Sequence, residues 1–198
     1  MSNESLSSRL ILASSSKYRK MLLDRLGIPF ECLAPGIDET PGESESPFDL
    51  VFRLADEKAK TVSNDHPDAI VIGSDQVAVF ENRIIGKPGC HRVALEQLSS
   101  FSGKTVKFLT ALTVRCLATD FTEQYVDTTR VCFRKIEAEE IERYLETEKP
   151  YDCAGAFKAE SLGIALFEKI SSDDPTALIG LPLIRTAAML RKAGLQLP

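Results

Sequence analysis

AIVIGSDQVAVFENRIIGKP, residues Ala69–Pro88, is the stretch on which the predicted fold depends. It opens with an apolar, β-branched run, Ile70–Ile72, which predicts a buried strand. We expect this strand to stop at Gly73-Ser74, with Asp75 just beyond it. Val77–Phe80 is expected to continue extended, and Ile84-Ile85 to lead back to Lys87 after a turn. Open α/β sheets bind ligands at the carboxyl ends of their strands. The carboxylate and the ammonium therefore indicate an active site for a phosphorylated, nucleotide-like substrate.

The composition limits the class of protein. A chain of 198 residues can bury a core of its own, and we predict one domain over residues 1–198, with 1–8 as a flexible polar tail. The net charge of −5 argues against a nucleic-acid polymer as partner, because such binding depends on cations that neutralise phosphates. The apolar runs are too short to span a membrane, so no membrane association is expected.

The cysteines and histidines narrow the chemistry further. The five cysteines are scattered and show no CxxC spacing, which predicts reduced thiols and a cytoplasmic protein. The chain has only two histidines, which disfavours a zinc site or a nucleophile activated by histidine. Any metal is expected to be a hard cation held by carboxylates.

The order of periodic segments predicts an α/β fold with a mixed sheet flanked by helices. Expected strands are Arg9–Ala13, Phe30–Ala34, a long hairpin of Thr105–Leu117 and Glu123–Arg134, and Ile164–Phe167. Expected helices follow Ser14–Ser16, begin at Ser46, span His91–Phe101 and Glu137–Glu148, and end the chain before Gly194. We interpret the charges of the acidic helix Glu137–Glu148 as a solvated face.

The first expected helix has an unusual charge pattern. Lys17, Arg19 and Lys20 crowd its first turn, where the helix dipole is already positive and cations cost up to about 1 kcal/mol each. A phosphate bound there, beside Ser14 and Ser16, would reverse that sign. The alternative is a solvated basic helix end with no ligand, and both remain open on the residues alone.

Lys58 lies on the apolar stripe of the helix that begins at Ser46. It follows Leu54 by four residues and Ala55 by three, so its stem points along the inward face. A lysine there can snorkel to the rim of the stripe or direct its ammonium into a phosphate site. Spacing does not separate these two interpretations.

Motifs for several other kinds of chemistry are absent, including the nucleotide-binding GxxxxGK[ST] and GxGxxG and the zinc-binding HExxH. The remaining polar groups are acids, cations and a serine loop. Such groups suit hydrolysis of a phosphoanhydride, with Mg²⁺ or Mn²⁺ on the carboxylates and an oriented water. The candidates are Glu39, Asp75, Glu160, Arg19, Lys58, Lys87, Lys158 and Ser14–Ser16.

The order of several short motifs resembles the Maf family of nucleotide pyrophosphatases over nearly the whole chain. These motifs are Ser14-Ser15-Ser16-x-x-Arg19, Asp38-Glu39, Glu57-Lys58-Ala59, Gly73-Ser74-Asp75, Gly86-Lys87-Pro88, Ala154-Gly155-Ala156-Phe157 and Gly180-Leu181-Pro182. The resemblance implies an elongated fold similar to the inosine-triphosphate pyrophosphatases, with two lobes around a deep cleft. It also implies cleavage of a nucleoside triphosphate to the monophosphate and pyrophosphate with a divalent cation.

The resemblance also implies roles for residues. Asp75 matches the position of the family's proton acceptor. Asp75 and Glu39 also match the positions of carboxylates near the metal. Arg19, Lys58 and Lys87 fall on positions that contact phosphate, and the serine loop, Ser14 and Ser16 in particular, is expected to bind substrate. A homodimer is plausible by the same resemblance.

Three positions bear on the substrate base. Family members that act on dTTP and UTP tend to have Arg, Thr and Gln where this chain has Tyr18, Gln76 and Glu160. The chain is similar instead to the YceF-type branch, whose preferred substrate is 7-methyl-GTP. A cationic 7-methylguanine would stack on Tyr18, and Glu160 can accept from the N1–H and N2–H of guanine. The plainer alternatives are a packed Tyr18, a solvated Gln76 and a Glu160 paired with Lys158.

Cys153 stands where the pyrimidine branch has a lysine, and we expect Lys158 to replace that charge. Three other functions compete with this one. They are a nucleotide-binding regulator of cell division that does not cleave its ligand, a pyrophosphatase of dTTP or UTP, and a phosphomonoesterase.

Overall fold

The computed structural model describes residues 9–197, so the predicted flexible tail, 1–8, lies outside the described residues. Seven strands form one sheet in the order β2-β1-β3-β5-β6-β7, with β4 beside β3. They are β1 (Leu10–Leu12), β2 (Glu31–Cys32), β3 (Ile70–Phe80), β4 (Arg83–Ile85), β5 (Thr105–Cys116), β6 (Phe121–Phe133) and β7 (Phe167–Ser171). Strands β2, β1 and β3 are parallel and all other pairs are antiparallel. The predicted mixed α/β fold is confirmed.

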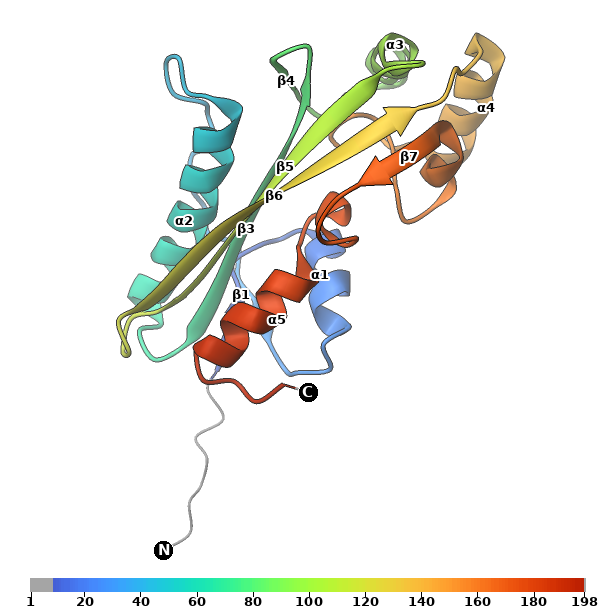
Figure 1. Cartoon of the computed structure of the whole chain (residues 1–198). Helices are drawn as coiled ribbons and strands as arrows, with labels where there is room; N and C mark the ends of the chain where they lie inside the picture. Colours follow the sequence, from blue (N-terminus) through green and yellow to red (C-terminus); the bar gives the residue numbers. More distant parts are fainter. Residues whose placement is uncertain (1–8, 198) are drawn as a thin grey trace, which may run out of the picture.

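Helices cover both faces of this sheet (Figure 1). They are α1 (Lys17–Asp24), α2 (Pro47–Asp65), α3 (His91–Phe101), α4 (Ala138–Glu148) and α5 (Leu183–Lys192). Successive strand residues point to opposite faces. In β1, Ile11 packs in the cluster that holds Ala59 of α2, whereas Leu10 and Leu12 pack in the cluster that holds Leu22 of α1 and Met189 of α5. One helix therefore lies on one side of β1, and two lie on the other.

The central strand β3 is longer than predicted. The expectation that it stops at Gly73 is wrong, because β3 runs without a break from Ile70 to Phe80. Its antiparallel ladder with β5 continues from Val71 to Val79 and holds the backbone extended through Gly73-Ser74. Asp75 thus lies inside a strand and not at its carboxyl end.

The other edge of β3 explains how Asp75 still reaches a ligand. On that edge, the last β3 residue that pairs with β1 is Ile72, opposite Leu12. Pairing of β3 with β4 starts only at Ala78. Between these points no strand of residues 9–197 pairs with that edge of β3, and the chain leaves β1 through the serine loop into α1. A cleft can therefore open beside Asp75, at the point where the parallel strand β1 ends.

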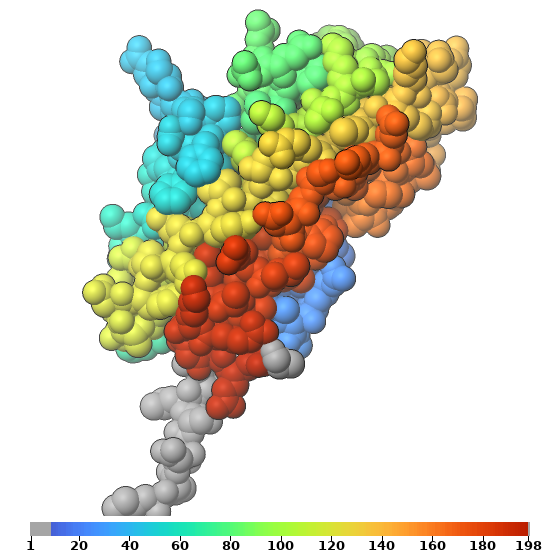
Figure 2. Space-filling model, viewed as in Figure 1, coloured from blue at the N-terminus to red at the C-terminus, as the bar shows by residue number. Residues whose placement is uncertain are grey.

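Two large apolar clusters occupy the two ends of the long strands. One joins α3, α4 and β7 around Phe101, Phe108 and Phe133, and the other joins β1, α1 and α5 around Leu12 and Leu112. The molecule is accordingly elongated along β3, β5 and β6, with the N- and C-terminal segments at one end (Figure 2). This arrangement agrees with the predicted two lobes.

Smaller differences occur at the ends of the chain's strands. The second strand is only Glu31–Cys32, shorter than the predicted Phe30–Ala34. The predicted strand Ile164–Phe167 is wrong: Leu162–Leu166 is a 3₁₀ helix and the strand is Phe167–Ser171. Apolarity alone does not separate a strand from a short helical turn. Within residues 9–197, no helix is both long and apolar enough to cross a bilayer.

Candidate active site

The floor of the candidate site is an ammonium held between two carboxylates. Lys58 Nζ lies 2.6 Å from Asp75 Oδ1 and 2.6 Å from Glu39 Oε1. Lys58 and Asp75 are only 4% and 7% exposed, whereas Glu39 is exposed. The ammonium therefore points inward into a charged cluster and does not snorkel to the surface. A buried lysine without such partners would be costly.

Close packing of α2 on β3 brings this pair together. A Cβ at Gly73 would lie 2.2 Å from the Ala55 carbonyl oxygen and 2.7 Å from the Ala59 amide nitrogen. Only glycine therefore allows this approach. Lys58, on the same face of α2 as Leu54 and Ala55, then reaches Asp75, two residues beyond Gly73.

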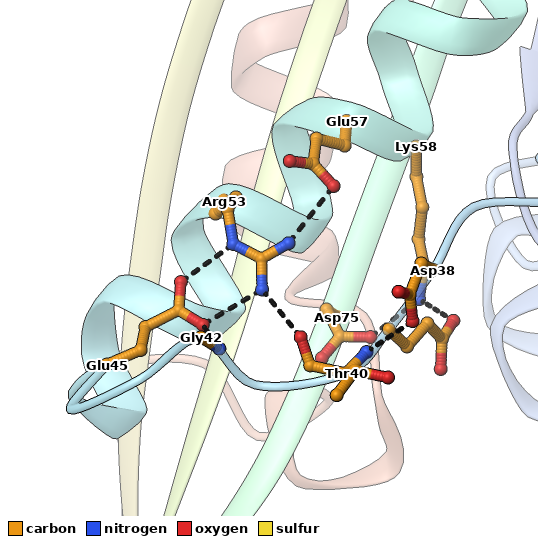
Figure 3. A network of polar contacts seen from close by, with 9 residues as sticks. Asp38, Thr40, Gly42, Glu45, Arg53, Glu57, Lys58 and Asp75 are labelled. Atoms are coloured by element: carbon orange, nitrogen blue, oxygen red, sulfur yellow. Dashed lines mark hydrogen bonds and ion pairs between the residues drawn. The ribbon is translucent and has the colours of Figure 1, made fainter.

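The loop before α2, which carries Glu39, is held in place by a second cation of α2, Arg53, whose contacts are drawn in Figure 3. Arg53 Nε and Nη2 donate to the two carboxylate oxygens of Glu45 at 2.7 and 2.9 Å, and Nη2 also donates to the Thr40 carbonyl at 3.2 Å. Its Nη1 donates to Glu57 at 3.1 Å. Burial alone would raise the pKa of Glu39, but the hydrogen bond and charge of Lys58 hold that pKa below its usual value.

The N-terminus of α1 forms a second wall. Ser16 is the N-cap, as expected for one of the three serines, and accepts from the Arg19 amide. Arg19 Nε donates to the Gly180 carbonyl at 3.0 Å, and Nη1 donates to Ser14 Oγ at 3.4 Å. Burial lowers the pKa of Arg19, and Asp75 and Glu39 oppose that shift. Arginine is not deprotonated in proteins, so the guanidinium stays charged.

These walls enclose a cavity of about 740 Å³, a size suited to a small organic ligand. Ten of the predicted site residues line it: Ser14, Ser16, Tyr18, Arg19, Glu39, Lys58, Asp75, Gln76, Lys87 and Glu160. Three of its cations and two of its acids lie close together, because the charges of Lys58, Arg19 and Lys87 all act on Glu39 and that of Asp75 acts on Arg19. This group, here called the cationic end of the cavity, carries an excess of positive charge suited to a polyanion.

Lys158 is the predicted site residue that is not brought to the cavity lining. Its Nζ donates to the Glu148 carbonyl at 2.5 Å and lies 3.3 Å from Glu148 Oε2. The expectation that Lys158 replaces the charge lost at Cys153 therefore finds no support in this geometry. The alternative in which Lys158 pairs with Glu160 finds none either. The view of the α4 charges as merely solvated is wrong for Glu148.

Gln76 presents one end of its amide to the cavity. Its Nε2 donates to Thr110 Oγ1 at 2.8 Å and to the carbonyls of Ala177 and Leu178 at 2.9 and 3.1 Å. Two carbonyls around one atom identify that atom as the amino end. The donor of Gln76 is thus occupied, and Oε1 is the group left for a ligand.

Tyr18 and Cys153 meet across the rim of the cavity. Tyr18 Oη lies 3.4 Å from Cys153 Sγ, and Lys17 Nζ lies 4.9 Å from the centre of the Tyr18 ring. Lys17 itself pairs with Asp152 at 3.2 Å. Burial and the contact with Cys153 raise the pKa of Tyr18, so the phenol stays neutral. Burial raises the pKa of Cys153 to about 11, so the thiol also stays protonated at neutral pH.

Some contributors to the site were not identified from the sequence. The Gly180 carbonyl accepts from both Arg19 and Ser74, and it lies within the Gly180-Leu181-Pro182 motif. The ion pair of Arg53 with Glu57 is predictable from the sequence, because the two residues are four apart on one helix. Its contact with Glu45 is tertiary, and no spacing rule predicts it.

The fold resembles a solved structure described as that of the Staphylococcus aureus Ham1 protein. The two share a TM-score of 0.50 at 12% identity over 94% of this chain and 100% of that chain. A likeness at that identity concerns the fold alone, and it defines the class as an α/β protein of this architecture. Residues 9–193 match the family described as Maf-like protein, and the chain belongs to this Maf family.

Closer relatives cover nearly all of the chain. A protein of Polaromonas sp. is 52% identical over 95% of this chain and 86% of its own length. Proteins of Aromatoleum aromaticum and Vibrio parahaemolyticus are 51% and 49% identical, each over 96% of this chain and over 98% and 97% of their own lengths. All three are named 7-methyl-GTP pyrophosphatase.

Proposed function

We propose that this chain hydrolyses 7-methyl-GTP to 7-methyl-GMP and pyrophosphate. The observation that carries the proposal is the identity of about half of all residues, over nearly the full chain, with relatives named for that activity. The cavity supports it independently. Its cationic end suits a triphosphate, and its lining also includes an aromatic ring, an amide and a carboxylate, from Tyr18, Gln76 and Glu160.

In this proposal, the phosphates bind at the cationic end of the cavity. Arg19 and Lys87 face the space beside the N-terminus of α1, where Ser14 and Ser16 line the wall. A helix N-terminus adds a partial positive charge for the same anion. This use of α1 accounts for Arg19 in its first turn, whereas Lys17 pairs with Asp152 and Lys20 is exposed and does not line the cavity.

Asp75 is the proposed base for the attacking water. Lys58 donates to Oδ1, and Oδ2 is left to accept a proton from a water at the α- or β-phosphorus. Lys58, fixed by the same contact, is placed to neutralise charge that develops on the phosphate oxygens. The bond between the α- and β-phosphates breaks, and pyrophosphate leaves.

A divalent cation, Mg²⁺ or Mn²⁺, is part of the proposal, with Glu39 and Asp75 as the residues that would hold it. Within the described residues no group of three or more metal-ligating side chains is present. Two carboxylates still fit, because Mg²⁺ is often held by one or two carboxylates together with phosphate oxygens of the substrate. When bound, the ion would neutralise triphosphate charge.

Tyr18, Gln76 and Glu160, which also line the cavity, are the proposed readers of the base. The cationic 7-methylguanine ring favours an aromatic face, and Tyr18 supplies one that stays neutral. Gln76 Oε1 and the Glu160 carboxylate are both acceptors, and the N1–H and N2–H of guanine are both donors. Uracil and thymine offer a single N3–H on that edge and fit this pair less well.

The test is a product assay on the purified protein with Mg²⁺ and a panel of 7-methyl-GTP, GTP, dTTP and UTP. We expect release of pyrophosphate, with 7-methyl-GTP as the preferred substrate. Binding without product would indicate a nucleotide-binding regulator, and orthophosphate as first product would indicate a phosphomonoesterase. Preference for dTTP or UTP would overturn the substrate assignment while leaving the reaction intact.

The proposal extends to the compartment and the assembly of the enzyme. The five cysteines of the described residues are all free, which suits reduced thiols in the cytoplasm. A homodimer, and the action of the chain as one domain, follow from the family resemblance. Size-exclusion chromatography with light scattering measures the oligomeric state.

A further inference from the structure

The segment that carries Glu160 is a tight loop between Lys158 and Gly163. The Ser161 amide donates to the Lys158 carbonyl at 3.3 Å. A Cβ at Gly163 would lie 2.4 Å from that carbonyl oxygen, so the loop closes tightly on itself. Glu160 stands at the middle of the loop and lines the cavity.

Glu148, the last residue of α4, holds this loop on both sides of Glu160. Its Oε1 accepts from the Leu162 amide at 3.1 Å and from the Ser161 hydroxyl. Its Oε2 lies 3.3 Å from Lys158 Nζ, which also donates to the Glu148 backbone carbonyl at 2.5 Å. One carboxylate therefore contacts the residues before and after Glu160.

The surroundings favour a rigid attachment. The side chains of Glu148 and Lys158 are 13% and 21% exposed, and the Lys158 amide donates to Tyr144 Oη at 3.1 Å. The hydrogen bond from Ser161 holds the pKa of Glu148 below its usual value; burial opposes this shift, and the contacts with Leu162 and Lys158 add to it. Charge-assisted hydrogen bonds of this kind are stronger than those between neutral groups.

Glu160 has no such support of its own. Within residues 9–197 its carboxylate has no hydrogen-bond or ion-pair partner, and the residue is exposed. The position of that carboxylate therefore depends on the backbone of the loop. A displacement of about 1 Å at a positioning contact can change a rate by about 10²-fold.

We propose that Glu148 and Lys158 are positioning residues that set base selectivity by fixing the loop of Glu160. This inference rests on the proposed function, because it assumes that Glu160 reads the guanine edge. Glu148 touches neither base nor phosphate, since it does not line the cavity. Lys158 thereby acts through the loop and not as a phosphate ligand.

The test compares Glu148→Ala with Glu146→Ala, a control on the same helix whose side chain is exposed. For Glu148→Ala we expect kcat/KM for 7-methyl-GTP to fall about tenfold, mostly through KM, with turnover of UTP within about twofold of wild type. Glu148→Gln keeps the acceptor oxygen for Leu162 and is expected to recover part of the loss. Circular dichroism and the melting temperature of each variant establish that the fold persists.

Two further measurements separate positioning from a general structural effect. In a Glu160→Gln background, Glu148→Ala is expected to have no additional effect on discrimination. Hydrogen exchange of the peptide covering 151–163 is expected to quicken in Glu148→Ala and not in Glu146→Ala. Wild-type turnover of 7-methyl-GTP with unchanged discrimination in Glu148→Ala would overturn this inference alone. A wild-type protein that releases no pyrophosphate from 7-methyl-GTP would overturn the proposed function and this inference with it.

Discussion

At the floor of the cavity, Asp75 and Lys58 stand on a central strand and on the 19-residue helix α2, whereas Glu160 at the rim stands on a short loop. The two acidic residues also differ in their contacts. Asp75 is buried and accepts directly from Lys58, while the loop of Glu160 is held by Glu148 at a distance from the ligand space.

The difference indicates that catalysis and base recognition are carried by separate parts of the structure. Groups that activate water and neutralise phosphate need fixed positions for every substrate, and regular elements supply them. Groups that read a base can stand on loops, which change without rearranging the sheet. The reaction and the choice of substrate can then be altered separately, and substitutions at the two places should have separable effects.

Loss of the floor cation should have the largest effect. Lys58→Ala leaves the buried Asp75 carboxylate without its partner beside Glu39. We expect kcat to fall by about 10²–10³-fold for every nucleotide tested and the free energy of unfolding to fall by about 3–5 kcal/mol. Steady-state kinetics and urea unfolding measure these changes. Lys60→Ala, at an exposed position of the same helix, should change neither.

The contact between α2 and β3 should come next. Gly73→Ala places a methyl group against the backbone of Ala55, and we expect a loss of stability of about 3 kcal/mol or incomplete folding. Thermal unfolding measures it. At Gly42 an added Cβ makes only ordinary contacts, so Gly42→Ala should melt within a few degrees of wild type. Equal melting temperatures for all three proteins would refute the packing argument.

The loop that carries Glu39 is intermediate between the two regions, because a residue of α2 holds it. Arg53→Met removes the contacts with Glu45 and Thr40. We expect kcat/KM to fall about tenfold and the half-saturating Mg²⁺ concentration to rise, without loss of base discrimination. A Mg²⁺ titration of activity, with Lys60→Met as the control, measures this. A change in discrimination would assign the loop to the base end instead.

The smallest effect concerns pH. The hydrogen bonds from Arg53, and then from the Gly42 amide, lower the pKa of Glu45 to about 2. A carboxylate whose pKa is lower in the folded state stabilises the fold above its unfolded pKa, and that contribution is lost as the pH falls toward 2. The melting temperature of Glu45→Gln should therefore lie slightly below wild type at pH 7 and converge with it between pH 5 and pH 2. Glu43→Gln, at an exposed position without this contact, should show no such convergence.

Local patterns predicted much of the floor. The 3.6-residue period placed Lys58 on the inward stripe of α2, and the strand signal placed Asp75 just beyond a buried strand. Spacing left the direction of the ammonium open, because its partner Glu39 comes from a loop whose path no periodicity records. The continuation of β3 through Gly73 was also missed, since it depends on pairing with β5, more than 30 residues later.

The rim was harder to predict for the same reason. Tyr18, Gln76 and Glu160 were selected through family resemblance, and local pattern alone favoured plainer interpretations of them. The contact of Glu148 with Ser161 and Leu162 spans 13 and 14 residues and joins a helix end to an irregular loop. Glu148 therefore looked like one more charge on an acidic helix.

The central claim is that Asp75 serves the reaction and Glu160 the choice of base. Its most direct test is the ratio of kcat/KM for 7-methyl-GTP to that for UTP, measured in Asp75→Asn and in Glu160→Gln. Asp75→Asn should lower both values by about 10³-fold and leave the ratio unchanged. Glu160→Gln should lower the ratio at least about tenfold while turnover of UTP persists. Full turnover in Asp75→Asn, or an unchanged ratio in Glu160→Gln, would contradict the account.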